Sequence, residues 1–322
     1  MQVNEIGIAT DGPANAGLLH QLETELAYYA ECGFHLVELD PLPFSIIVHG
    51  ELRRPQLENY VAVLKNFDFR YSMHGLERLS LAYDSRHQLC QQIMMGQLEI
   101  CRAVGASRLV YHSGLQALDT VRHGVRRSLL TDKELAEGAQ REVAALKKVA
   151  AVAADAGVTI CLENGDPHHW EFDLMARFGR PRTELVKHQA WLLIEPIVRQ
   201  LETIDHPNVA MTLDIAHLHI GAHNLEFDYL EAVEKAAPWV KHLHANDNFG
   251  HLDQGSEETP YLLAFGEADL HLPPGWGGIP YGEVFARLST YEGDLILEIK
   301  PSFRDYFGEG LKNMKKILGD LN

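Results

Sequence analysis

Long hydrophobic runs, cysteines and basic residues are all scarce in this sequence. No apolar run reaches the roughly 20 residues that a membrane-spanning helix needs, so we expect no contact with a membrane. Residues 1–5 have no basic segment followed by an apolar one, so we expect no secretory signal. The four cysteines contain no C-x-x-C pair, which indicates free thiols in a reducing cytoplasm.

Positive charge is also in short supply. The chain has 28 Lys and Arg residues against 45 Asp and Glu residues, a formal net charge of −17. Binding to nucleic acid depends largely on neutralising phosphates, so this balance makes a nucleic-acid partner unlikely. The 18 histidines, in contrast, are numerous and favour a metal-binding protein.

Short apolar segments alternate with longer amphipathic ones through the whole chain. The pattern predicts strands over residues 5–10, 36–40, 70–74, 108–113, 159–164, 209–215, 240–245 and 295–300. It predicts helices over residues 17–32, 55–66, 85–104, 132–156, 183–204, 226–237, 281–290 and 305–318. Eight such repeats predict an α/β protein with one (β/α)8 TIM barrel domain over residues 1–322. Length alone also allows two domains, and a doubly wound open sheet is the alternative, although no G-x-G-x-x-G follows the first strand.

The predicted connections differ in length in an informative way. Those from helix to strand are short, whereas three of those from strand to helix are long: residues 114–131, 165–182 and 246–280. A TIM barrel builds its active site from the strand-to-helix loops at the C-terminal face. The long loops therefore lie where chemistry is expected.

Possible metal ligands stand at the ends of six successive predicted strands, and further ones follow in two short motifs. Asp214 and His217 form an Asp-x-x-His pair, and Asp269 and His271 form an Asp-x-His pair. Imidazole nitrogen with carboxylate oxygen suits zinc, manganese or iron. The expected ligands are His74, His112, Glu163, Asp214, His217, His244, Asp269, His271 and Glu298.

Structural roles explain some of these residues equally well when each is taken alone. Asp214 is also well placed to cap a helix, with His217 packed beside it. Six polar strand ends in register, however, would bring carboxylates together, and a bound cation is the simplest remedy for their repulsion. Glu38 and Asp40, at the end of the second predicted strand, are candidates for orienting the ligands.

Six segments carry a resemblance to the xylose isomerase-like TIM barrels, which include sugar phosphate isomerases and epimerases and the endonuclease IV family. They are residues 71–74 (YSMH), 162–164 (LEN), 213–217 (LDIAH), 242–248 (HLHANDN), 269–277 (DLHLPPGWG) and 297–300 (LEIK). The epimerase branch implies one ion, held here by Glu163, Asp214, His244 and Glu298. The endonuclease branch implies three zinc ions, with His74, His112, His217, Asp269 and His271 as the additional ligands. We therefore expect a divalent metal cofactor, zinc or manganese, with one to three ions.

The two branches imply different chemistry. For isomerisation or epimerisation of a small sugar, sugar phosphate or polyol, Glu163 removes a proton from the substrate and Glu298 returns it, or the reverse. For phosphoester hydrolysis, the metal cluster stabilises the attacking and leaving oxygens. We favour the isomerase or epimerase, with the trinuclear zinc hydrolase as the alternative and a non-catalytic metal- or sugar-binding barrel as the third interpretation.

Other residues in the long loops and after the last strand are weaker candidates for substrate binding. Tryptophan rings stack on sugars, and Arg and Lys side chains hold phosphate or carboxylate groups. The candidates are Trp170, Arg126, Arg180, Trp276 and Lys300. The Ala-rich helix predicted over residues 132–156 is compatible with a homo-oligomer, although covering the barrel explains it as well.

Overall fold

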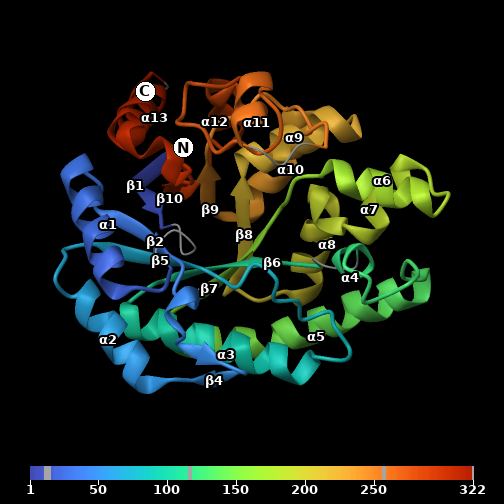
Figure 1. Cartoon of the computed structure of the whole chain (residues 1–322), viewed down its shortest axis with the longest axis horizontal. Helices are drawn as coiled ribbons and strands as arrows, with labels where there is room; N and C mark the ends of the chain where they lie inside the picture. Colours follow the sequence, from blue (N-terminus) through green and yellow to red (C-terminus); the bar gives the residue numbers. More distant parts are fainter. Residues whose placement is uncertain (11–15, 115–117, 256–258, 321–322) are drawn as a thin grey trace.

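Eight parallel strands close into a barrel in the computed structural model, which describes residues 1–10, 16–114, 118–255 and 259–320. Their order around the barrel is β1, β10, β9, β8, β7, β6, β5 and β2 (Figure 1). The bounds are β1 Gln2–Ala9, β2 Leu36–Leu39, β5 Arg70–His74, β6 Arg108–His112, β7 Thr159–Glu163, β8 Val209–Asp214, β9 Val240–Ala245 and β10 Glu292–Leu297. The predicted (β/α)8 barrel is confirmed, and a small antiparallel hairpin of β3 Ile47–Val48 and β4 Glu51–Leu52 is added to it.

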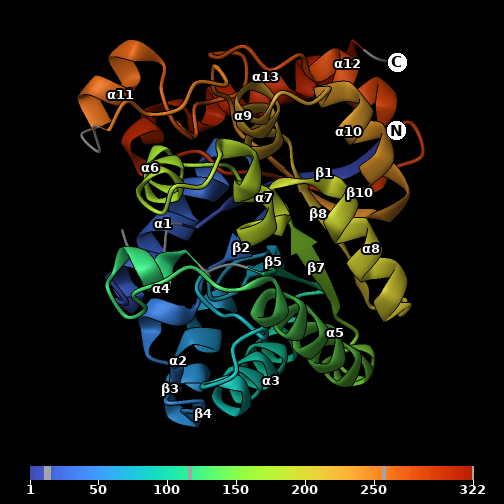
Figure 2. The ribbon, with the colours of Figure 1, turned by 90° about the vertical axis from the view of Figure 1, so that its right-hand side faces the viewer.

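Helices surround the barrel on its outer side (Figures 1 and 2). The α-helices are α1 Leu19–Cys32, α2 Arg54–Leu64, α3 His87–Val104, α4 Asp119–Arg122, α5 Asp132–Asp155, α6 His169–Arg177, α7 Leu185–His188, α8 Ile194–Ile204, α9 Ile215–Leu225, α10 Tyr229–Ala236, α11 Thr259–Phe265, α12 Tyr281–Arg287 and α13 Phe307–Gly319. Short 3-10 turns are η1 Leu42–Phe44, η2 Arg182–Glu184, η3 Ala190–Leu192, η4 Ala237–Trp239 and η5 Pro301–Tyr306.

Burial follows the two periodicities of the sequence. Every residue of β8 is buried, as expected for a barrel strand with side chains inside and helices outside. In α3 the buried side chains recur every three or four residues, so that one stripe of the helix faces the barrel. That stripe includes Cys90, Met94, Leu98 and Cys101. The four cysteines are free, as predicted, and three of them are buried.

Three predicted elements needed correction. The helix predicted over residues 183–204 is divided into η2, α7, η3 and α8. Of these, α8 is the longest helix and covers the end of the predicted range. Residues 216–225, for which no element was predicted, belong to α9. The helix predicted over residues 226–237 is α10, which begins at Tyr229. The last strand, predicted over 295–300, is Glu292–Leu297, so Glu298 follows its end; the Glu298 amide still donates to the Ala245 carbonyl, 3.1 Å away.

The long loops predicted after the strands carry short helices of their own. α4, α6 and α11 lie along one side of the molecule in Figure 2. Residues 115–117 and 256–258, inside two of these loops, lie outside the described residues. Over the described part of the chain, no helix has the length and apolar character needed to cross a membrane.

Candidate metal centre

The nine predicted ligands come together at the C-terminal mouth of the barrel, where they form three adjoining groups. Each group offers nitrogen and oxygen atoms that all lie within 4.8 Å of one another. The first group consists of His74, His112 and Glu163; the second of Glu163, Asp214, His244 and Glu298; and the third of His217, Asp269 and His271.

The first group joins the ends of three neighbouring strands. His74 ends β5, His112 ends β6 and Glu163 ends β7, so the parallel register sets them side by side. Glu163 Oε2 lies 2.6 Å from His112 Nε2 and 3.8 Å from His74 Nε2, and the two imidazole nitrogens are 3.3 Å apart. Three possible metal-ligand atoms, two nitrogens and one oxygen, therefore lie close together.

The second group uses the other oxygen of the same glutamate. Glu163 Oε1 lies 2.7 Å from His244 Nδ1, and Glu298 Oε1 lies 3.3 Å from the same nitrogen. Asp214 completes the group from the end of β8, where the Asn164 side chain holds its backbone through two hydrogen bonds of 2.9 and 3.0 Å. Glu163 thus faces two groups at once.

The third group lies between α9 and the loop after β9. Asp269 Oδ2 lies 3.3 Å from His217 Nε2 and is in close contact with His271 Nε2. Lys300 Nζ donates to the Asp269 carbonyl at 2.6 Å and fixes that residue's backbone.

Backbone carbonyls orient three of the histidines. The Nδ1 atoms of His74, His217 and His271 lie 2.9, 3.1 and 2.7 Å from the carbonyl oxygens of Gly75, Asn164 and Glu298. A carbonyl only accepts, so each Nδ1 carries the proton and each Nε2 turns its lone pair toward its group. Histidines that bind metals are commonly held in this way.

The carboxylates of the centre are crowded, and their pKa values diverge. Burial opposes ionisation of Glu163, yet the His244 and His112 rings hold its pKa well below its usual range. Burial, reinforced by the charge of Glu298, raises the pKa of Asp214 to about 8. The raised pKa of Asp214 marks a local excess of negative charge that a cation would relieve.

The residues present fit a divalent metal. Asp214 Oδ2 and Asp269 Oδ1 are buried and have no hydrogen-bond partner within the described ranges. Buried polar atoms without partners are costly in a folded protein, and a bound cation would satisfy them. The mixture of imidazole nitrogen and carboxylate oxygen suits zinc, manganese or iron.

A cavity of about 760 Å³ opens above the centre. Its lining includes ligands from all three groups together with two of the predicted substrate-binding residues, Trp170 and Lys300. The Arg122 guanidinium lies 4.5 Å from the centre of the Trp170 ring at the same wall. The space is therefore polar near the candidate ligands and aromatic at one side, and it has the size of a small-molecule site.

The other three predicted substrate-binding residues do not line this cavity. Arg126 pairs with Glu134 at 2.8 Å, and Arg180 lies 3.6 Å from Glu184. Trp276 donates to Glu309 at 2.8 Å and packs against the ring of Tyr306. The partners of these three side chains also lie outside the lining of the cavity.

Two features of the site were not predicted as parts of it. Trp191 lines the cavity, and its ring lies nearly parallel to that of His112, with 6.1 Å between ring centres. His242, two residues before His244 on the same face of β9, contacts Glu38 at a distance of 2.7 Å. The sequence carried a signal for His242, because it shares a strand face with His244, but none for Trp191. Asp40, suggested together with Glu38, instead accepts from the Leu42 amide at 3.2 Å.

Comparison with known proteins places these residues on a recognised scaffold. A family model described as a xylose isomerase-like TIM barrel matches residues 26–317. None of the curated proteins compared with the chain matches it.

Solved structures share the complete fold at low sequence identity. A D-tagatose 3-epimerase-like protein is 19% identical with a TM-score of 0.66, over 99% of this chain and 98% of that one. A D-psicose 3-epimerase from Clostridium cellulolyticum, crystallised with D-tagatose, is 15% identical with a TM-score of 0.66, over 98% and 99%. A protein from Thermus thermophilus, soaked with zinc chloride, is 20% identical with a TM-score of 0.63, over 98% of both chains.

Proposed function

The chain belongs to the family of xylose isomerase-like TIM barrels, and from this premise we propose that it is a divalent-metal-dependent isomerase or epimerase of a small carbohydrate-type substrate. One observation carries the proposal. Glu163, at the end of β7, and Glu298, just after β10, lie 2.7 and 3.3 Å from the same nitrogen of His244, and both line the cavity. The sugar 3-epimerases among the similar structures support the substrate class.

The two glutamates suit proton transfer at a carbon next to a carbonyl. One carboxylate takes the proton from that carbon, and the other carboxyl group returns a proton to the opposite face or to the adjacent atom. No electron acceptor is required, because product and substrate are isomers. A divalent ion held by Glu163, Asp214, His244 and Glu298 supplies Lewis acidity that polarises the carbonyl and hydroxyl oxygens of a bound sugar.

The cavity determines what kind of substrate is suitable. Its volume of about 760 Å³ accommodates a monosaccharide or its phosphate but not a nucleic-acid duplex. Trp170 and Trp191 add aromatic side chains to the lining, and Lys300 adds a cation. The net charge of −17 disfavours a polyanion as substrate.

Proton exchange tests this proposal directly. Protein loaded with Zn²⁺ or Mn²⁺ is incubated in D2O with a panel of ketoses, aldoses and their phosphates, and the substrate C–H signals are followed by NMR. We expect deuterium at a carbon next to the carbonyl, together with a new isomer. Glu298→Gln should lower the rate at least ~100-fold, the usual contribution of a general acid or base.

Glu195→Gln is the matched control, because Glu195 forms a surface ion pair with Lys235, 2.7 Å apart, away from the site. It should leave the exchange rate unchanged. Wild-type protein that exchanges no proton in any sugar of the panel, or a Glu298→Gln variant as fast as wild type, would contradict the proposed reaction.

Phosphoester hydrolysis is the second candidate, and a specific observation favours it. Glu163 places one oxygen in the first group and the other in the second, so that a bridging role would occupy the carboxylate needed for proton transfer. The first and third groups also exceed what a single ion requires. Release of phosphate from sugar phosphates, or of the alcohol from model phosphodiesters, that is lost in His112→Asn and His271→Asn but retained in Glu195→Gln would favour this alternative.

A further inference from the structure

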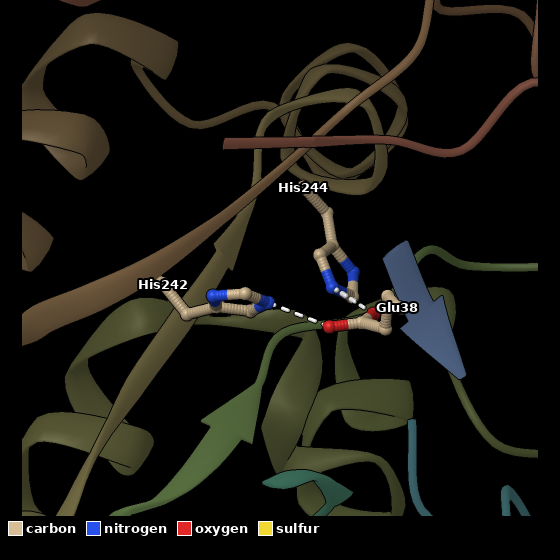
Figure 3. A group of neighbouring side chains, drawn as sticks. All are labelled: Glu38, His242 and His244. Atoms are coloured by element: carbon tan, nitrogen blue, oxygen red, sulfur yellow. Dashed lines mark hydrogen bonds and ion pairs between the residues drawn. The ribbon is translucent and has the colours of Figure 1, made fainter. Parts of the chain in front are cut away.

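A buried polar cluster lies inside the barrel next to the metal groups. Figure 3 shows Glu38, from β2, between His242 and His244, both from β9. The side chains are almost completely buried, with exposed fractions of 0%, 1% and 0%. The interior of a TIM barrel is normally filled with branched apolar side chains, and a buried carboxylate is costly unless it is paired. A buried carboxylate with two histidines at this place therefore needs a structural or functional explanation.

The two oxygens of Glu38 have different partners. Oε2 accepts hydrogen bonds from His242 Nε2, at 2.7 Å, and from Ser72 Oγ, at 2.9 Å. Oε1 lies 2.8 Å from His244 Nε2. These last two atoms are imperfectly aligned, and neither has a hydrogen-bond partner elsewhere in the described structure. Among the described residues, each therefore finds its possible partner in the other.

The opposite edge of the same ring faces the metal groups. His244 Nδ1 lies 2.7 Å from Glu163 Oε1 and 3.3 Å from Glu298 Oε1. Carboxylates face both ring nitrogens of His244. With a cation bound in the second group, the contact with Glu38 would hold the ring proton on Nε2 and leave the Nδ1 lone pair toward that ion. His244 differs in this respect from the three histidines that backbone carbonyls hold through Nδ1.

We propose that Glu38 is a positioning residue for the metal centre: it anchors His244 Nε2 so that Nδ1 binds the ion of the second group. His242 and Ser72 hold the Glu38 carboxylate in place. β2 and β9 are not neighbours in the barrel, so the interaction crosses its interior. The proposal rests on the metal dependence proposed above, and it adds residues that do not contact the ion.

Glu38, His242 and His244 also satisfy the distance criterion for a metal site of their own. Their surroundings argue against it. All three side chains are almost completely buried, and none of them lines the cavity. Glu38 Oε2 already accepts from both His242 Nε2 and Ser72 Oγ. The cluster is therefore assigned to support of His244.

Zinc affinity, measured by competition with a chromophoric chelator, tests the assignment in Glu38→Gln. We expect one ion to be bound 10–100-fold more weakly than in wild type, with the remaining ions and the circular dichroism spectrum unchanged. Cobalt-substituted protein gives a second readout. Its visible absorption should change in Glu38→Gln, because the orientation of a ligand changes.

Glu142→Gln is the matched control. Glu142 is also a buried glutamate, 3% exposed, that accepts hydrogen bonds from Tyr111, Ser113 and Gln200. Its loss should lower stability without altering the cobalt spectrum. A control variant that loses zinc affinity as Glu38→Gln does would overturn the assignment, since the effect would then be a general one of core damage.

The remaining outcomes separate this inference from the proposed function. Wild-type protein that binds no zinc overturns both. Wild-type protein that binds zinc while Glu38→Gln binds it equally well overturns the positioning role alone. A fourth ion, lost only in Glu38→Gln, would make the cluster a metal site and overturn the role as well. If Glu38→Gln does not fold, the Ser72→Ala variant replaces it in the test. We expect that variant to bind zinc a few-fold more weakly, and unchanged zinc affinity would contradict the proposal.

Discussion

Asp214 performs two tasks with its two carboxylate oxygens. Oδ1 accepts from the His217 amide at 2.6 Å and so caps the first turn of α9. Oδ2 is buried without a hydrogen-bond partner in the part of the chain that the structure describes, and it belongs to the second metal group. The structural and the functional interpretations of the Asp-x-x-His motif therefore both hold, because each uses a different atom.

The strand-end residues of the site could be predicted from the sequence because side chains alternate along a strand and parallel strands end at one edge. The link from Glu38 to His242 could not, since 204 residues separate them and no local pattern records which side chains meet across a barrel. Direct contacts between remote strands need the closed fold.

Replacement of Gly165 tests how closely the side chain of Trp191, which lines the cavity, is packed against the backbone. A Cβ atom there would lie 1.4 Å from the Trp191 ring, which itself lies beside His112. Gly165→Ala should therefore lower the free energy of unfolding by about 2 kcal/mol through overpacking. Urea denaturation measures this loss.

Gly282→Ala, in α12, is the control because an added Cβ meets nothing within 4 Å. It should be neutral or stabilise the protein by up to about 1 kcal/mol, since alanine favours a helix over glycine. Equal stability of Gly165→Ala and wild type would show that Trp191 moves away without cost.

Among the elements, the segment between Arg182 and Ile204 departs most from its predicted helix. α8 begins at Ile194, and Pro196 lies in its first turn, where proline is tolerated. That proline was a usable signal that no helix continues through it. The chain before it breaks into short turns that bring Trp191 against Gly165, a tertiary contact that outweighs helix propensity.

The helix α5 is stabilised at its start by a capping box. The Thr131 side chain accepts from the Glu134 amide, and the Glu134 carboxylate accepts from the Thr131 amide at 2.8 Å. Thr131→Ala should lower the free energy of unfolding by about 1 kcal/mol in urea denaturation. Thr203→Ala removes a hydroxyl that bonds only to the Arg199 carbonyl within the hydrogen bonds described, and it should cost clearly less.

The same cap predicts a dependence of stability on pH. Hydrogen bonds from the backbone and side chain of Thr131, with Arg126, lower the pKa of Glu134 to about 2. A carboxyl group with a depressed pKa in the folded state stabilises above its unfolded pKa, and this contribution is lost as pH falls toward 2. The difference in stability between wild type and Glu134→Gln should therefore shrink between pH values of about 6 and 3.

Glu137→Gln, in the same helix, controls for the removal of one acidic charge. Glu137 lies 3.7 Å from Lys133 and takes no part in the cap. A pH trend as large in Glu137→Gln as in Glu134→Gln would argue that overall charge, and not the cap, is responsible.

For the molecule as a whole, the closed barrel explains why residues spread from position 74 to position 298 act as one site. Eight strand ends meet at one mouth, and the strand-to-helix loops supply the walls of the cavity. The fold and the positions of the nine candidate ligands could be predicted from repeated local patterns. The shape of the cavity could not, because α4, α6 and α11 are short helices inside long loops, where local signals are weak.

Metal content is the measurement that tests the central claim most directly. Protein purified without chelator or affinity-metal resin should contain at least one equivalent of zinc or manganese per chain by elemental analysis. A value near one would fit the second group and proton transfer by Glu163 and Glu298, whereas a value near three would fit all three groups and favour phosphoester hydrolysis. Protein that contains no divalent metal, even after incubation with zinc and manganese, would contradict the account.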